Sequence, residues 1–175
     1  MDKFIYIKRK AFSKDQCKYI IDFFEKQKSE PNERGYEGAY VNLHQSGLGF
    51  VGNIVGDNTK KYSDKHPFLH ELYLRWDIVS EFHLQRYLPG RAYGGEHMEH
   101  GKDDCDSRRL LGWMIYLNDI RNKGGTRWPQ QNFISKPRAG DLYIWPSGWT
   151  HSHYGIPAPK ENKYFISGWC SLMMG

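Results

Sequence analysis

The sequence has few cysteines and no long apolar run, and each shortage excludes a class of protein. Its three cysteines, Cys17, Cys105 and Cys170, are too few and too scattered for a disulfide framework or a paired-cysteine zinc site. No apolar run reaches the roughly 18 residues that a membrane-spanning helix needs, and the N-terminus has no signal-peptide pattern. We therefore expect a soluble protein of a reducing compartment, the cytoplasm, with no membrane partner.

The net charge of the chain is also small. There are 25 lysines and arginines against 20 aspartates and glutamates, which gives a net charge of +5. The basic residues are dispersed in short groups such as Lys8 to Lys10 and Arg108 to Arg109, whereas nucleic-acid-binding proteins concentrate them. We expect no nucleic-acid partner, and we take the chain to be a monomer.

Aromatic residues are abundant, at 15% of the chain, and many stand in short segments separated by glycine and proline. This texture favours strands with tight turns over a helical bundle. A chain of 175 residues is long enough to bury a core without disulfides. We expect one domain over residues 1–175 of the mainly β (α+β) class, with helices and loops to about residue 80 supporting a β core over residues 80–175.

The first part of the chain predicts the supporting elements. Ser13 and Gln16 form a capping box, so a helix should begin there and run to about Lys28. Residues 30–62 are rich in glycine, asparagine, serine and aspartate, and we expect mostly loops. The other expected elements are strands at Phe4–Ile7 and around Tyr40–Val41 and Phe50–Val51, and a helix from Pro67 to about Ile78.

The second part of the chain predicts about eight short strands, enough to close a jelly roll. Turns at Pro89-Gly90, Gly124-Gly125 and Ala139-Gly140 separate them. The clearest strands are expected at Phe82–Tyr87, Leu111–Leu117, around Trp128, Phe133–Ile134, Asp141–Trp145 and Lys163–Leu172.

His97 and Glu99 are candidate metal ligands. A strand has a period of two, so residues two apart point to one face and can hold one metal. A second histidine is then needed from a distant strand, and His151 and His153 are both available. Two histidines and one carboxylate form the facial triad of non-haem iron, which leaves positions open for a bidentate 2-oxo acid and O₂.

Lys163 is a candidate for the fixed cation that such a 2-oxo acid requires. On a strand it shares one face with Phe165, Ser167 and Trp169, so it would lie among apolar side chains inside the barrel. A buried lysine needs an anionic partner. The alternative is that Lys163 stands at the exposed end of its strand and is solvated.

Several motifs between Phe82 and Gly175 follow one another in a recognisable order. They are Tyr87-Leu88-Pro89-Gly90 with Tyr93; His97-Met98-Glu99; Arg109 before Trp113-Met114-Ile115-Tyr116-Leu117-Asn118; Gly124-Gly125-Thr126; Pro137-Arg138-Ala139-Gly140-Asp141; and His153-Tyr154-Gly155-Ile156-Pro157 with Lys163 and Trp169. The set resembles the double-stranded β-helix (cupin-like) dioxygenases, most closely the collagen-type prolyl 4-hydroxylases and their small microbial and viral relatives.

The resemblance implies a reaction and its cofactors. An Fe(II)- and 2-oxoglutarate-dependent dioxygenase would use O₂ to hydroxylate C4 of a prolyl residue in a peptide or protein, release succinate and CO₂, and take ascorbate as reductant. If the protein is viral, the compartment would be the host cytoplasm. The implied residues are His97, Glu99 and His153 for iron; Lys163, Tyr87 and Thr126 for 2-oxoglutarate; and Arg109, Tyr93 and Trp169 for substrate.

Some features depart from the family pattern. The family usually has aspartate where Glu99 stands, and we expect the extra methylene to be absorbed at Gly94 and Gly95. One additional residue separates Tyr93 from His97. Of the two downstream histidines, His153 begins the matching His-Tyr-Gly-Ile-Pro run, which favours it over His151.

Other interpretations stay open at this point. Tyr93 and Trp169 are equally consistent with core aromatics, and Arg109 with a surface cation. The oxygenase could act on another side chain or on a small molecule; an open groove beside residues 34–57 would admit a peptide, and a closed pocket would favour a small molecule. A non-catalytic jelly roll that stacks a sugar or peptide on Trp145 and Trp149, or a cupin-like site for zinc or manganese, are further alternatives.

Overall fold

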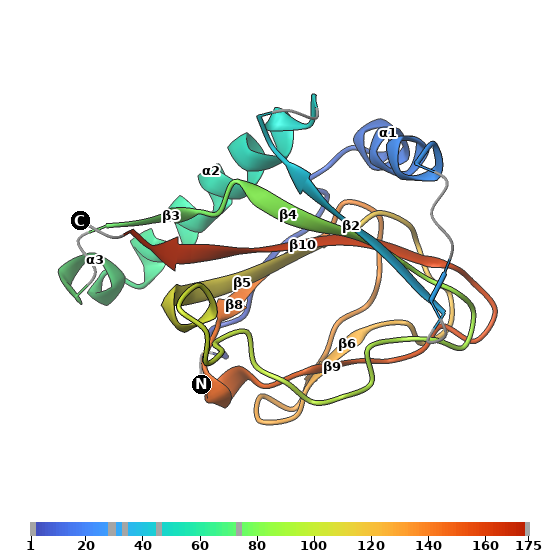
Figure 1. Cartoon of the computed structure of the whole chain (residues 1–175). Coiled ribbons are helices and arrows are strands. Elements are labelled where there is room, and N and C mark those ends of the chain that lie inside the picture. Colours follow the sequence, from blue (N-terminus) through green and yellow to red (C-terminus); the bar gives the residue numbers. More distant parts are fainter. Residues whose placement is uncertain (1–2, 28–30, 33–34, 45–46, 73–74, 174–175) are drawn as a thin grey trace.

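Antiparallel strands dominate the computed structural model, which describes residues 3–27, 31–32, 35–44, 47–72 and 75–173 (Figure 1). The major sheet has the strand order β1-β8-β5-β10-β4-β2, and β3 pairs with β10. Its strands are β1 (Tyr6–Lys8), β2 (Tyr36–Asn42), β3 (Trp76–Ile78), β4 (Glu81–Tyr87), β5 (Arg109–Tyr116), β8 (Leu142–Pro146) and β10 (Lys163–Leu172). The minor sheet, β7-β6-β9, consists of β6 (Thr126–Trp128), β7 (Phe133–Ile134) and β9 (Tyr154–Gly155).

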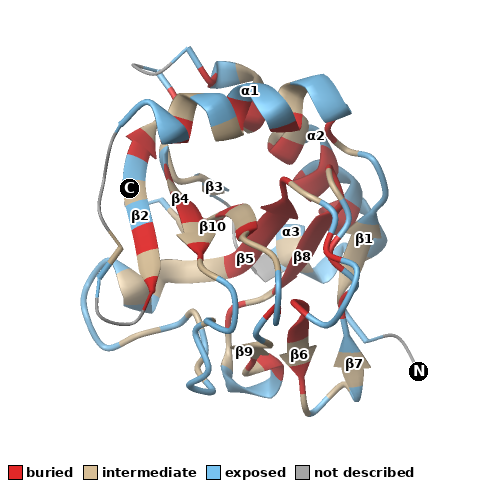
Figure 2. Ribbon diagram, turned by 90° about the vertical axis from the view of Figure 1, so that its right-hand side faces the viewer, coloured by how far each residue is buried: buried red, intermediate tan, exposed pale blue. Residues whose placement is uncertain are grey.

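Two helices cover the outer face of the major sheet, and the minor sheet lies on its other side (Figure 1). The helices are α1 (Lys14–Glu25) and α2 (Gly49–Lys65), followed by the short α3 (Phe68–Leu72) and the 3₁₀ turns Asp106–Arg108 and Trp149–His151. Buried residues concentrate in β5 and β8 and on parts of α1 and α2 (Figure 2). Among the described residues, no helix is long and apolar enough to cross a membrane.

The helix α1 begins where the sequence predicts and ends at Glu25, before the predicted end near Lys28. The Ser13 hydroxyl accepts a hydrogen bond from the Gln16 N–H at 3.1 Å, and the Gln16 side chain accepts one from the Ser13 N–H at 2.9 Å. Cys17, Ile20 and Phe24 recur at helical spacing and are buried against the sheet.

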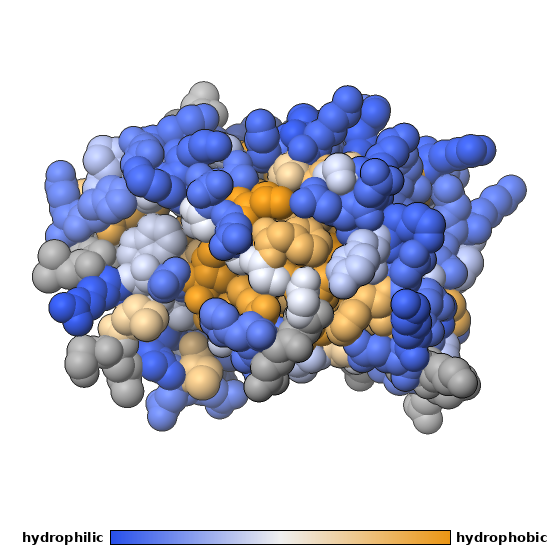
Figure 3. All heavy atoms as spheres, turned by 90° about the horizontal axis from the view of Figure 1, so that it is seen from above, coloured by the Kyte–Doolittle hydropathy of each residue, from blue (hydrophilic) through white to orange (hydrophobic). Residues whose placement is uncertain are grey.

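Seen from above, the surface is mainly hydrophilic, with an apolar area exposed near its centre (Figure 3).

The predicted strand at Phe50–Val51 is wrong, because these residues lie in α2. The glycine and asparagine content of the segment suggested loops, since these residues are poor helix formers. However, Val51, Val55 and Tyr62 recur at helical spacing and are all buried. Packing on the sheet therefore outweighs the intrinsic preference of the segment.

The predicted helix from Pro67 to about Ile78 is also wrong in its second half. The helix α3 ends at Leu72, and Trp76–Ile78 forms β3, which pairs with Leu172 to Cys170 of β10. Residues 36–42 are a further difference, because they form the full strand β2 where a short strand among loops was expected. The mainly β, double-stranded β-helix class is confirmed.

The turn before β8 depends on a glycine. Gly140 has a φ of +83°, its N–H donates to the Tyr116 carbonyl at 2.8 Å, and its carbonyl accepts from the Phe12 N–H at 3.2 Å. A Cβ atom at this position would collide with the Phe12 carbonyl. The absence of a side chain thus lets the N-terminal segment reach β8 and the end of β5.

We expect Gly140→Ala to lower the free energy of unfolding by at least about 2 kcal/mol, because it combines a left-handed φ with a backbone collision. Gly148→Ala is the matched control, since Gly148 has a φ of −76° and a Cβ there meets no atom within 4 Å. Urea unfolding followed by circular dichroism measures both. Equal midpoints for the two variants would contradict this account of the turn.

Candidate metal centre and its cavity

A cavity of about 500 Å³ lies between the two sheets and brings together the residues that the family resemblance implies for iron, 2-oxoglutarate and substrate. Residues of β4, β5, β8 and β10 form one wall, and residues of β6 and β9 contribute to the other. The candidates that line it are Tyr87, Tyr93, His97, Glu99, Arg109, Thr126, His153, Lys163 and Trp169.

His97, Glu99 and His153 form a compact group on one side of this cavity. The backbones of His97 and His153 exchange two hydrogen bonds, of 3.0 and 2.8 Å, which place the two rings 4.4 Å apart. Glu99 follows on an extended segment that is not a regular strand, and its N–H donates to the Ser147 carbonyl at 3.1 Å. One ligand atom from each side chain lies within 4.8 Å of the others.

The two histidines present the same ring nitrogen to the group. Nδ1 of His97 donates to the Gly95 carbonyl, and Nδ1 of His153 donates to the His151 carbonyl, each at 3.0 Å. Nε2 of His153 lies 3.2 Å from Oε1 of Glu99. Burial, together with the neighbouring His153, lowers the pKa of His97 and favours the neutral ring that binds metals. Two such nitrogens and one carboxylate fit the donor set of a facial triad for Fe(II).

The Glu99 carboxylate is held from its other side. Its Oε2 accepts a hydrogen bond from Nε1 of Trp169 at 2.6 Å. Burial by itself would raise the pKa of Glu99, but the hydrogen bond and charge of His153 and the Trp169 hydrogen bond lower it overall, so the carboxylate is ionised. One oxygen is thereby left to face the histidines.

The side chain of Glu99 packs against Gly112. A Cβ at Gly112 would lie 3.0 Å from Cγ of Glu99 and 2.9 Å from the Trp145 ring. A Cβ at Gly94 or Gly95 would have no atom of Glu99 within 4 Å. The absence of a side chain at Gly112 thus leaves room for the Glu99 side chain, whereas an adjustment of the loop at Gly94 and Gly95 stays a prediction.

His151 points away from the group. Its Nε2 donates to the Lys3 carbonyl and its Nδ1 accepts from the Thr150 hydroxyl, each at 3.0 Å. Both ring nitrogens are therefore engaged outside the cavity. The geometry favours His153 as the second histidine ligand.

Lys163 lies in the same cavity, at the start of β10. Only 2% of the residue is exposed, and its Nζ lies 5.5 Å from the Tyr87 ring centre and 5.4 Å from that of Phe165. No carboxylate of the described ranges forms an ion pair with it, and burial lowers its pKa to about 8. This lysine is a buried cation in need of an anion.

Arg109, Trp169 and Tyr93 surround the metal ligands. The Arg109 guanidinium lies 3.7 Å from the centre of the Trp169 ring, and its NH1 donates to the Glu99 carbonyl at 3.1 Å. The Tyr93 ring meets the His97 ring edge-on at 4.5 Å and is 51% exposed. Arg109 and Trp169 therefore both donate hydrogen bonds to Glu99, Arg109 to its backbone carbonyl and Trp169 to its carboxylate.

Sequence reasoning missed an aromatic wall formed by Tyr36, Tyr40 and His83. The Tyr40 ring stacks on His83 at 4.4 Å, the Tyr36 hydroxyl is hydrogen-bonded to His83, and all three line the cavity. Burial lowers the pKa of His83 to about 4, so the ring is neutral near pH 7. The signal is the alternation of Tyr36, Gly38 and Tyr40, which extends the short strand predicted around Tyr40–Val41 back to Tyr36.

The tryptophans proposed for a binding module do not form one surface. Trp145 is 2% exposed and packs against His153 with the rings 5.0 Å apart, whereas Trp149 is 75% exposed. A buried indole offers no free face for a sugar or peptide. This arrangement removes the main structural support for the non-catalytic alternative.

Comparisons with known proteins agree with this site. A family model described as the 2OG-Fe(II) oxygenase superfamily matches residues 82–171. A putative prolyl 4-hydroxylase of Acanthamoeba polyphaga mimivirus is 30% identical over 114 residues, which cover 54% of this chain and 46% of the relative. The match thus spans about half the length of that curated relative.

Solved structures share the fold at low identity. The viral collagen prolyl hydroxylase of Paramecium bursaria Chlorella virus-1, in its 2OG complex, superimposes with a TM-score of 0.77 at 18% identity, covering 98% of this chain and 97% of that one. A Pseudomonas putida prolyl-4-hydroxylase gives a TM-score of 0.74, also at 18% identity, and covers 98% and 94%. At such identities the likeness shows the fold alone.

We expect His153→Ala to abolish binding of a divalent metal at this group and His151→Ala to leave it intact. The reason is that only the His153 ring faces Glu99, whereas His151 is bonded to Thr150 and Lys3. Titration with Co(II), followed by its visible absorption, measures binding without turnover. Loss of the Co(II) spectrum in His151→Ala, with the spectrum retained in His153→Ala, would reverse the assignment.

Proposed function

Because the chain belongs to the 2OG-Fe(II) oxygenase superfamily, we propose that it hydroxylates C4 of a prolyl residue in a peptide or protein. The family implies Fe(II), 2-oxoglutarate and O₂: one oxygen atom enters the substrate, and 2-oxoglutarate is converted to succinate and CO₂. The observation that carries the proposal is the cavity in which His97, Glu99 and His153 share one space with the buried Lys163.

His97, Glu99 and His153 are the proposed iron ligands. When bound, iron supplies the redox chemistry of O₂ that no side chain can perform. The protein contributes two imidazoles oriented by backbone carbonyls and a carboxylate oriented by Trp169. Ascorbate is the proposed reductant that keeps the metal ferrous.

Lys163 is the proposed partner of the distal carboxylate of 2-oxoglutarate. One carboxylate of this dianionic co-substrate would provide the anionic partner that the buried ammonium needs. Tyr87 lies opposite Lys163 in the β4–β10 pair, and its ring stacks on Phe165. The Thr126 hydroxyl, bonded to Tyr116 at 3.0 Å, lines the same space. We propose that Tyr87 and Thr126 complete the 2-oxoglutarate site.

Exposed apolar and aromatic side chains line the cavity and suit a proline ring. Tyr40, Tyr93 and Met98 are 64%, 51% and 44% exposed, and each lines the cavity. Such faces contact proline well because its ring is rigid and apolar. The prolyl hydroxylase names of the relatives point to the same substrate class. Arg109, Tyr93 and Trp169 are the proposed substrate contacts, and Arg109 and Trp169 also position Glu99.

We expect the protein to hydroxylate proline-rich peptides when supplied with Fe(II), 2-oxoglutarate and ascorbate. Succinate should form in step with a peptide product heavier by one oxygen, and tandem mass spectrometry should place that oxygen on proline. Peptides with alanine in place of proline are the control. Succinate that forms equally with both peptide sets would contradict the prolyl assignment while leaving the oxygenase assignment in place.

We expect 2-oxoglutarate binding to weaken as the pH rises through about 8, the pKa of free Lys163. The lowered pKa leaves the lysine charged below this pH and neutral above it. From pH 7 to pH 9 the dissociation constant should rise about tenfold as the ammonium is lost.

Two Lys163 variants separate the charge of this residue from its shape. Lys163→Arg stays charged, so its dissociation constant for 2-oxoglutarate should change little over this pH range. Lys163→Met should weaken binding on the order of 100-fold at pH 7. Calorimetric titration of the metal-loaded protein without O₂ measures the dissociation constant of 2-oxoglutarate for the wild type and for both variants. Wild-type affinity in Lys163→Met would remove this residue from the site.

A further inference from the structure

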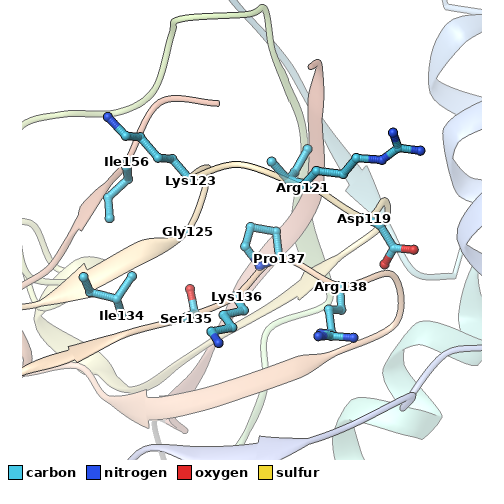
Figure 4. A pocket seen from close by; sticks show the side chains of 11 residues that line it. Asp119, Arg121, Lys123, Gly125, Ile134, Ser135, Lys136, Pro137, Arg138 and Ile156 are labelled. Carbon is cyan, nitrogen blue, oxygen red and sulfur yellow. The ribbon is translucent and has the colours of Figure 1, made fainter. Parts of the chain in front are cut away.

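A second hollow, of about 680 Å³, is lined by residues that stand just before β6, at and after the end of β7, and just after β9 (Figure 4). Gly125 lines this hollow, and the next residue, Thr126, lines the metal cavity. Between the two, the Ser135 hydroxyl accepts from the Thr126 N–H at 2.8 Å and is hydrogen-bonded to the Tyr116 hydroxyl at 2.7 Å. Residues adjacent in sequence therefore face the two spaces, and hydrogen bonds of Ser135 link this part of the chain to Tyr116.

Four exposed cations surround this hollow, and we call the set the basic groove: Arg121, Lys123, Lys136 and Arg138. None of the four forms an ion pair with a carboxylate of the described residues, whereas Lys18, Lys60 and Arg86 elsewhere do. The one carboxylate in the lining, Asp119, accepts a hydrogen bond from the Ala139 N–H at 2.9 Å. Glu161 lies beside this lining, where its carboxylate accepts a hydrogen bond from the Arg121 backbone N–H at 3.0 Å. With four cations against Asp119 in the lining, the groove keeps an excess of positive charge.

The cations of the basic groove are spread out and do not converge. Arg121 and Lys123 extend in opposite directions above Pro137, and Lys136 and Arg138 point away below it (Figure 4). A neighbouring hollow of about 940 Å³ shares Lys136 and Arg138. It adds the exposed Lys10 and Lys14 of the N-terminal segment. An extended chain with several negative charges fits this layout better than a single small anion.

The floor of the basic groove favours a peptide over a nucleic acid. It is built from aliphatic side chains, including Ile134, which is 46% exposed, Pro137 and Ile156. Single-stranded nucleic acids bind by stacking bases on aromatic rings. The described lining of both hollows contains one aromatic residue, Phe12, and it is 1% exposed. Aliphatic floor and cationic rims together match a segment of alternating acidic and apolar residues.

We propose that the basic groove docks an acidic segment of the protein substrate, remote from the prolyl residue that enters the metal cavity. The inference rests on the proposed function and adds a second contact to it. Docking at the groove would hold the target proline at high effective concentration near the metal cavity. Affinity for whole substrates would then depend on charge outside the reacting segment.

Direct binding tests the groove without any turnover. The probe is a fluorescein-labelled peptide of alternating glutamate and leucine, compared by anisotropy with a glutamine-for-glutamate peptide. We expect tighter binding of the acidic peptide, weakened by salt, and a loss of about tenfold in Lys123→Gln/Lys136→Gln. The control, Lys26→Gln/Lys61→Gln, removes the same charge from exposed lysines at the end of α1 and on α2 and should bind within about twofold of wild type.

Equal losses in the two double variants, or equal binding of the acidic and neutral peptides, would overturn the proposal. An oligothymidine of the same charge that displaces the probe at lower concentration than the unlabelled peptide would overturn the choice of a peptide partner. Neither outcome depends on whether the protein hydroxylates proline.

Turnover then tests the link between the groove and the substrate. A prolyl peptide with an acidic extension should have a lower KM than the same peptide with a neutral extension, at equal kcat. Lys123→Gln/Lys136→Gln should remove the difference in KM. If no prolyl peptide is hydroxylated, the proposed function fails, and the anisotropy result still shows whether the groove binds an acidic peptide. If peptides are hydroxylated with a KM that is the same for acidic and neutral extensions, docking of substrate at the groove is overturned.

Discussion

The pairing of His97 with His153 is the constraint on which the site depends. Two reciprocal backbone hydrogen bonds join a loop after β4 to the segment just before β9. The backbone carries this pairing, so it fixes the separation of the two main-chain positions from which the imidazoles project. The carbonyls of Gly95 and His151 then fix the orientation of each ring. A metal would meet ligands that are already arranged, and little ordering would remain to oppose binding.

The cavity contains two buried groups of opposite charge, the Glu99 carboxylate and the Lys163 ammonium. Glu99 is stabilised as a carboxylate by the Trp169 hydrogen bond, and Trp169 is in turn covered by the Arg109 guanidinium. Lys163 has aromatic neighbours in place of a carboxylate, and burial lowers its pKa. An elongated dianion that binds a metal at one end and an ammonium at the other would satisfy both ends of this space together. The selectivity for 2-oxoglutarate would then follow from the placement of charge.

Sequence spacing predicted what depends on local geometry, and it failed where distant contacts decide. The pair His97 and Glu99, and the position of Lys163 on an inward strand face, follow from a period of two residues. The room for Glu99 depends on Gly112, which is far from it in sequence and adjacent only in the folded chain. For the same reason the sequence predicts mostly loops where α2 forms, because burial against the sheet compensates for the poor helix formers of this segment. The contact of Gly112 with Glu99 leaves no mark on a short window of sequence, and α2 leaves only the helical spacing of Val51, Val55 and Tyr62.

Two residues at the start of β6 face different spaces. Thr126 lines the metal cavity, and Gly125, the residue just before the strand, lines the hollow of the basic groove. The bonds of Ser135 to Tyr116 and Thr126 tie the two sides into one buried unit, and a close-packed unit of this kind resists deformation. A ligand in the groove would therefore leave the geometry of the metal ligands unchanged. Any benefit of docking would have to appear as capture of the substrate, with the chemistry at the metal centre unaltered.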